Sequence, residues 1–130
     1  MPAIMPSLTN IKVRQGSRRI EFTFDSGDVF NLTFEFLRVH SPSAEVKGHG
    51  PGQEILQTGK QSVGIKAINP VGHYAMQIDF DDGHDSGLYS WNYLYELGEN
   101  QDALWKRYLG ALDAAGASRD PEVQIIKLGI

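Results

Sequence analysis

The sequence contains no cysteine, and none of its apolar runs is long. Without cysteine the chain cannot build a disulfide framework, a thiolate zinc site or a cysteine nucleophile. A membrane-spanning helix needs about 20 predominantly apolar residues, and no charged start followed by an apolar segment marks a signal peptide. We therefore expect a soluble, cytoplasmic protein with no membrane partner.

An excess of positive charge is also lacking. Twelve Lys and Arg residues against sixteen Asp and Glu residues give a formal net charge of −4. This balance argues against a nucleic-acid partner, because such proteins neutralise phosphates with basic side chains. The acidic excess lies in residues 71–130, which hold ten acidic and four basic residues. We interpret it as a solvated face, with an acidic docking surface or a cation site as the alternative.

The residues that are present fit one α+β domain. Hydrophobic residues make up 41% of the 130 positions, enough for a core in a chain of this length. Strand patterns precede helical patterns without regular alternation, which is typical of α+β folds. We predict a small antiparallel or mixed β-sheet, a short helical turn after the first hairpin, and two C-terminal helices packed on the sheet. The domain is expected over residues 10–116, between a flexible start at 1–9 and a tail at 117–130.

Apolar periodicity and turn residues place the individual elements. We predict strands over 11–13, 19–24, 29–34, 63–68, 74–80 and 87–90, a helical turn over 35–39, and helices over 91–97 and 101–115. Ser90 and Asn100 are the expected N-caps of the two helices. Gly98 and Gly116 are expected to end them.

No complete catalytic constellation is present, so we expect a protein that is not an enzyme. Gly59-Lys60 is not a phosphate loop, because Gln61 stands where a Ser or Thr is required. In the run from Gly83 to Gly87, Asp85 occupies the position of the serine in a nucleophile elbow.

Three histidines beside predicted turns leave two interpretations open. The first is structural, with each ring capping a backbone carbonyl. The second is a divalent-metal site that uses His84 with His40 or His49 and acidic residues, because imidazole and carboxylate are competent metal ligands. Six aromatic residues are similarly ambiguous between core packing and a ligand pocket between sheet and helices: Tyr89, Trp91, Tyr93, Tyr95, Trp105 and Tyr108.

Three segments carry a resemblance to a known family: LRVHSPSAEVKGHG at 37–50, PVGHYA at 70–75 and FDDGHDSGLYSW at 80–91. The chain resembles the gamma-butyrobetaine hydroxylase-like N-terminal domain, in its short stand-alone bacterial form, to which no activity is assigned. Related domains are fused to iron- and 2-oxoglutarate-dependent oxygenases, and to iron–sulfur carriers of the Mrp type. The resemblance implies a non-catalytic accessory module that binds an oxygenase-type or iron–sulfur carrier partner, in an iron–sulfur assembly context.

Oxygenase members of that family hold a structural zinc through a Cys-Pro-Cys-x-x-Cys run and a later histidine. The resemblance places these ligands at Ser41, Ser43, Val46 and His84. Because serine and valine do not replace thiolates, we expect no cofactor. We expect Ser41, Ser43 and His84 to meet instead in a hydrogen-bonded staple between two turns. The alternative retains zinc or iron by recruiting His40 or His49.

The predicted interaction surface combines a glycine-rich loop with an acidic turn. Flexible loops beside a fixed turn suit recognition, and the residues concerned are Gly48, His49, Gly50, Asp82, His84 and Asp85. A homodimer is the assembly that base rates favour. Its expected contact is the apolar tail, with Ile125, Ile126 and Leu128.

Overall fold

The fold combines six strands and four helices within the part of the chain that the structure describes. This computed structural model describes residues 6–126, 128 and 129; residues 1–5 of the predicted flexible start lie outside that range. In chain order the elements are β1 (Leu8–Arg14), β2 (Arg19–Phe24), β3 (Val29–Thr33), α1 (Phe34–Val39), α2 (Ala44–Lys47), β4 (Ile65–Val71), β5 (Ala75–Phe80), β6 (Leu88–Ser90), α3 (Trp91–Glu99) and α4 (Gln101–Ala115). No helix among the described residues is long and apolar enough to cross a bilayer.

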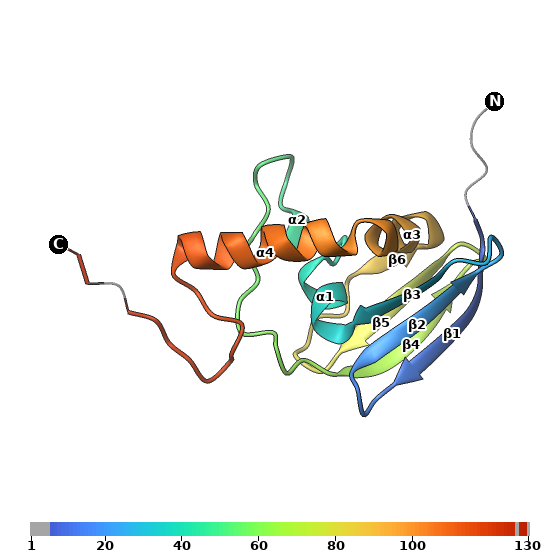
Figure 1. Cartoon of the computed structure of the whole chain (residues 1–130), viewed down its shortest axis with the longest axis horizontal. Helices are drawn as coiled ribbons and strands as arrows, with labels where there is room; N and C mark the ends of the chain where they lie inside the picture. The colour runs from blue at the N-terminus through green and yellow to red at the C-terminus, as the bar shows by residue number, and fades with distance from the viewer. Residues whose placement is uncertain (1–5, 127, 130) are drawn as a thin grey trace.

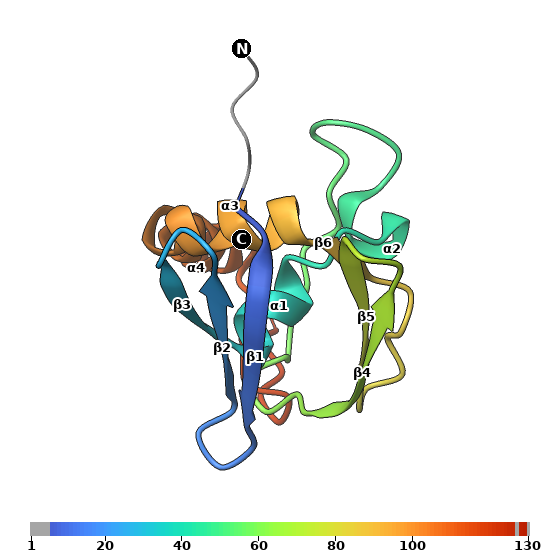
Figure 2. The same cartoon turned by 90° about the vertical axis from the view of Figure 1, so that its right-hand side faces the viewer.

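The strands form two antiparallel three-stranded sheets, β1-β2-β3 and β4-β5-β6. Each sheet is a meander of neighbouring strands, with β2 and β5 at the two centres. In β2, Ile20, Phe22 and Phe24 are buried at every second position, as strand periodicity predicts. In the view of Figure 2 the two sheets stand side by side with α1 between them. The α+β class is therefore confirmed, with the predicted sheet divided in two.

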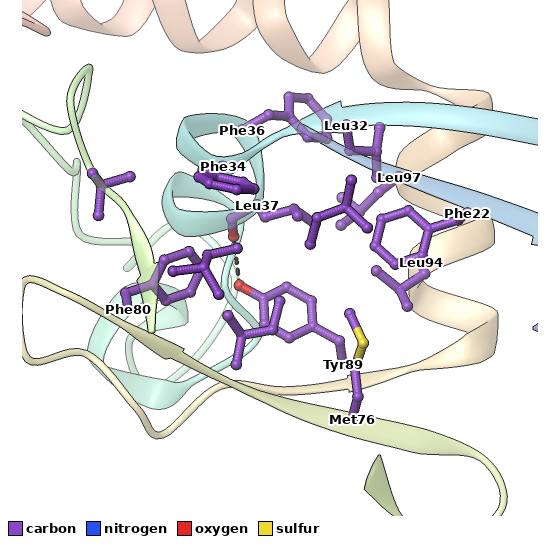
Figure 3. Packing of buried hydrophobic residues seen from close by; sticks show 14 of the residues in the cluster. Phe22, Leu32, Phe34, Phe36, Leu37, Met76, Phe80, Tyr89, Leu94 and Leu97 are labelled. Carbon is purple, nitrogen blue, oxygen red and sulfur yellow. Dashed lines mark hydrogen bonds between the residues drawn. The ribbon is translucent and has the colours of Figure 1, made fainter. Parts of the chain in front are cut away.

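One hydrophobic core joins the two sheets to α1 and α3 (Figure 3). Tyr89 of β6 lies at its centre and is fully buried, and its hydroxyl donates a hydrogen bond to the backbone carbonyl of Leu37 in α1. Burial of this phenol raises the pKa of Tyr89 far above its ordinary value, so the hydroxyl remains a donor. The bond links β6 of the second sheet to α1, which follows directly on the first.

Helix α1 is short but completely buried, since all six of its residues belong to the interior. Thr33 begins it, and its hydroxyl accepts a hydrogen bond from the Phe36 backbone N–H at 3.0 Å. Two of the six residues, Glu35 and Arg38, are charged. Buried charges require partners, so this helix must bring polar contacts into the interior.

The two C-terminal helices, α3 and α4, lie across the same side of the molecule in Figure 1. The predicted cap of α3 is confirmed, because the Ser90 hydroxyl accepts from the Tyr93 backbone N–H at 3.1 Å. Helix α4 has the predicted bounds and ends at Gly116, which adopts the left-handed conformation that favours glycine. Asn100 precedes α4 without a side-chain cap bond; its amide instead donates to the Glu96 carbonyl.

Several predicted boundaries are wrong: β1 begins at Leu8 and not at residue 11, β4 begins at Ile65 and not at residue 63, and helix α2 was not predicted. Two further differences have a clear physical reason. Gly98 does not end α3 but lies within it, where a Cβ would stand 2.3–2.7 Å from three ring atoms of Phe30. Glycine is therefore needed here for close packing of the helix on β3. Strand β4 continues through Pro70. Because β4 is an edge strand, the missing proline N–H costs no ladder bond.

The chain after Gly116 packs on the domain for several residues. The backbone N–H groups of Gly59 and Gln61 donate to the carbonyls of Ser118 and Arg119, both at 2.9 Å. No strand forms in the described part of this tail. Its apolar residues Ile125 and Ile126 are 49% and 71% exposed; the homodimer expected through them stays a prediction.

Candidate functional site

A hydrogen-bonded chain of three side chains, two of them buried and one exposed, joins the loop after α1, helix α2 and the turn between β5 and β6. Ser41 Oγ lies 2.8 Å from His84 Nε2, and His84 Nδ1 lies 3.0 Å from Glu45 Oε2. Because a carboxylate only accepts, Nδ1 carries a proton and donates it to Glu45; in the tautomer that has its single proton there, Nε2 accepts from the Ser41 hydroxyl. The predicted meeting of Ser41 and His84 is present, and Glu45 is a partner that the sequence did not single out for it.

The order serine, histidine, carboxylate also occurs in hydrolase triads, but this serine is not positioned for attack. Ser41 has no exposed surface. Gly87 covers it so closely that a Cβ there would lie 2.5 Å from Ser41 Oγ. A substrate carbonyl therefore cannot reach the hydroxyl, and the contact serves to hold the two turns together.

Ser43 makes a second link between the same two segments. Its hydroxyl lies 2.7 Å from that of Ser86 in the β5–β6 turn, and it accepts from the Glu45 backbone N–H at 3.2 Å, which caps α2. Val46, at the remaining position of the predicted zinc site, is buried and apolar. With Ser41 and Ser43 as hydroxyls and both nitrogens of His84 in hydrogen bonds, these residues do not fit a structural zinc ion.

The other two candidate metal ligands have separate surroundings. His40 Nδ1 donates to the Phe36 carbonyl at 2.9 Å and so closes the end of α1. His49 is exposed in the loop after α2. Within the described residues, no group of three or more His, Cys, Asp or Glu side chains is placed to hold a metal ion.

Asp82, predicted as a contact residue, is engaged in a structural ion-pair network. Its Oδ2 accepts from Arg38 Nε at 2.9 Å and from Lys60 Nζ at 2.6 Å, and its Oδ1 accepts from the His84 backbone N–H at 3.1 Å. Partial burial opposes ionisation of this carboxyl, but the hydrogen bonds from Lys60, the His84 backbone and Arg38 outweigh it and lower the pKa of Asp82 to about 2. Asp82 therefore fixes the turn that carries His84.

The rest of the predicted surface stays accessible around this junction. His49 and Asp85 are exposed, and Gly48 and Gly50 are partly exposed, whereas His84 is only 4% exposed. Gly48 has a φ of +73°, and a Cβ there would lie 2.0 Å from the Gln53 carbonyl oxygen, so the loop closes tightly at this point. We define the junction surface as four exposed residues: Glu45, Asp85 and Ser86, which belong to the contacting segments, and His49 in the loop after α2.

A second buried ion pair was not predicted from the sequence. Glu35 of α1 accepts two hydrogen bonds from the Arg119 guanidinium, at 2.6 and 2.8 Å, and the guanidinium lies over the Trp105 ring at 5.0 Å. The sequence does contain a sign that α1 needs charged partners, because Glu35 and Arg38 interrupt an apolar run. Nothing in the tail singled out Arg119 as the partner.

Two of the cavities among the described residues lie beside the predicted aromatic residues. One of about 430 Å³ lies beside the Glu35–Arg119 pair and Trp105. The other, of about 330 Å³, lies between α4 and residues 54–57. Of the six predicted aromatic residues, Tyr89 and Tyr108 are buried in the two hydrophobic clusters, and the remaining four are half-buried against them.

The comparisons with known proteins agree with the resemblance found in the sequence. The family described as gamma-butyrobetaine hydroxylase-like, N-terminal, matches residues 11–95. Two solution NMR structures are 46% and 50% identical to this chain, with TM-scores of 0.79 and 0.78; each covers 97% of it, and the matches span 99% and 95% of those chains. A crystal structure of a DUF971-family protein of unknown function from Acidithiobacillus ferrooxidans is 37% identical, with a TM-score of 0.59, over 71% of this chain and 92% of that one. No curated protein matches the chain.

Proposed function

This chain belongs to the gamma-butyrobetaine hydroxylase-like N-terminal family, and from that premise we propose that it is a non-catalytic module that binds a partner protein through the junction surface. The observation that carries the proposal is the Ser41–His84–Glu45 chain, which fixes α2 on the β5–β6 turn. Preorganised surfaces lose less conformational entropy on binding than flexible ones.

The charges of the junction surface indicate what kind of partner fits. Glu45 is 68% exposed at its side chain although it hydrogen-bonds His84, and Asp85, the residue after His84 in the chain, is exposed as well. Lys60 and Arg38 are already engaged by Asp82. Lys47 of α2 lies over the Tyr93 ring. The two charged residues of the junction surface, Glu45 and Asp85, are both acidic, and we expect a partner with a basic contact patch, since complementary charge favours encounter and orientation.

The family name supports a context for that partner. The name refers to a domain N-terminal to a hydroxylase, so an oxygenase-type protein is one expected partner, and an iron–sulfur carrier is the other by analogy with fused relatives. The choice of these two partners depends on the analogy with fused relatives and not on the geometry of the junction surface. Cytoplasmic location is part of the same proposal.

Site-specific photo-crosslinking tests the proposed function. A benzoylphenylalanine residue is placed at His49 or at Asp85, both exposed on the junction surface, and at Lys12 on β1 as a control that is also exposed. After irradiation of cells that express each variant, we expect one discrete adduct common to the first two positions and missing from the third. No adduct at His49 and Asp85, or the same adduct at all three positions, would reject the proposal.

A further inference from the structure

The cavity between α4 and residues 54–57 has the features of a small-ligand site that is separate from the junction surface. It has a volume of about 330 Å³, which is within the range of small-molecule sites. Apolar side chains make up much of its lining, among them Val39, Val46, Leu56, Leu104 and Tyr108. The Tyr108 hydroxyl donates to the Gln57 carbonyl at 2.7 Å, so it is already used in closing the wall.

His40 supplies an available hydrogen-bond acceptor to this cavity. Its Nδ1 is engaged with the Phe36 carbonyl. His40 Nε2 has no hydrogen-bond partner within the described part of the chain. Because no buried side-chain nitrogen or oxygen there lacks such a partner, Nε2 must be accessible to solvent. Burial lowers the pKa of His40, and the positive charges of Lys47 and Arg107 lower it further. The hydrogen bond to the Phe36 carbonyl raises the pKa but does not outweigh burial. At neutral pH the ring is therefore uncharged and Nε2 accepts.

Two cationic side chains, Lys47 and Arg107, line the same cavity. Within the described part of the chain neither forms an ion pair; the Lys47 ammonium lies over the Tyr93 ring at 5.0 Å. Glu54 is the one acidic residue of the described lining. Its pKa is lowered by hydrogen bonds from the backbone N–H groups of Glu54 and Gly52 and, to a smaller extent, by the charges of Arg107 and Lys47. The described lining therefore holds two cations against one carboxylate, an excess of one positive charge.

We propose that this cavity binds a small apolar carboxylate that also carries a hydroxyl or amide N–H. The carboxylate pairs with Arg107 and Lys47, the donor group hydrogen-bonds His40 Nε2, and the apolar body lies on Val46 and Leu56. Charge complementarity favours this occupant, because the lining of the cavity carries an excess of one positive charge in a protein whose net charge is −4. The inference does not depend on the proposed protein partner.

Titration of ¹⁵N-labelled protein with 2-hydroxy-4-methylpentanoate, followed by amide chemical shifts, tests the inference. We expect saturable shifts confined to residues 39–57 and the facing turns of α4. The neutral amide of the same acid and 4-methylpentanoate, which lacks the hydroxyl, should each bind about fivefold or more weakly. These two probes test the charge and the donor group separately.

Matched variants on α4 complete the test. Arg107→Gln should weaken binding of the hydroxy acid about fivefold, whereas Lys106→Gln, a neighbouring exposed cation that does not line the cavity, should leave it within about twofold. The inference is overturned by shifts that do not saturate by about 20 mM, by shifts spread over the whole surface, or by equal effects of the two substitutions.

Discussion

His84 Nε2 lies 2.8 Å from Ser41 Oγ, although 43 residues separate the two positions in the chain. The contact is buried from solvent at both ends, with Ser41 at 0% and His84 at 4% exposure. Because the remaining ring nitrogen is bonded to Glu45, the imidazole has no unsatisfied polar group. A fully satisfied buried network rigidifies its surroundings, and here it fixes the loop after α1 on the β5–β6 turn.

Removal of this imidazole should destabilise the protein without any metal being involved. His84→Ala leaves the Ser41 hydroxyl buried without its partner and creates a cavity. Together these effects should lower the free energy of unfolding by about 2–4 kcal/mol, measured by urea denaturation. His49→Ala, at an exposed position, should change it by less than about 0.5 kcal/mol. A similar small change in both variants would contradict the structural role of His84.

The Glu35–Arg119 pair makes the start of the tail part of the folded unit. Arg119→Ala leaves Glu35, whose side chain is 7% exposed, without its guanidinium. We expect a loss of about 2–4 kcal/mol in the free energy of unfolding, below the full cost of breaking a buried pair because Arg119 is partly exposed. Truncation after Gly116 should cost at least as much. If the truncated chain is as stable as the full one, residues 117–121 contribute nothing to the domain.

Two glycines in the C-terminal helices should respond oppositely to alanine. Gly98→Ala would bring a methyl group against the Phe30 ring, whereas nothing lies within 4 Å of a Cβ at Gly110. Thermal and urea denaturation should show a loss of about 1–3 kcal/mol for Gly98→Ala and a gain of about 0.5–1 kcal/mol for Gly110→Ala. Phe30→Leu should recover part of the first loss. Stabilisation by both substitutions would show that α3 does not pack closely on β3.

Acid should remove the stabilisation that the ionised Asp82 carboxylate gives the folded protein. Its folded-state pKa of about 2 lies below the ordinary value of 3.8, so the contribution is complete above about pH 4 and is lost as the pH falls toward 2. The difference in unfolding free energy between the wild type and Asp82→Asn should therefore shrink over that interval, in urea denaturation at a series of pH values. A difference that stays constant from pH 5 to about pH 2 would be inconsistent with the network to Arg38 and Lys60.

Local sequence signals predicted much of this structure. The alternation in β2, the Ser90 cap and the end of α4 at Gly116 depend on residues near one another in the chain. The Ser41–His84 contact is long-range, and it was predicted through the resemblance, which placed both residues at one site. Residue pattern alone does not join positions so far apart.

The features that could not be predicted depend on tertiary packing. An alternating pattern predicts a strand but does not show which strands pair. It could not show that β4 pairs with β5 in a second sheet and not with a strand of the first. The helical role of Gly98 depends on the ring of Phe30 beside it. Arg119 lies 84 residues from Glu35, and nothing in the tail distinguishes it from a solvated arginine.

The affinity of the cross-linked partner for variants of the junction surface tests the central claim most directly. Dissociation constants are measured by calorimetry for the wild type, the His49→Ala/Asp85→Lys variant and the Lys12→Glu variant, after unfolding curves show equal stability. The account predicts that the junction variant binds at least about tenfold more weakly, a loss of about 1.4 kcal/mol, while Lys12→Glu binds like the wild type. Equal affinity of the junction variant and the wild type would contradict it.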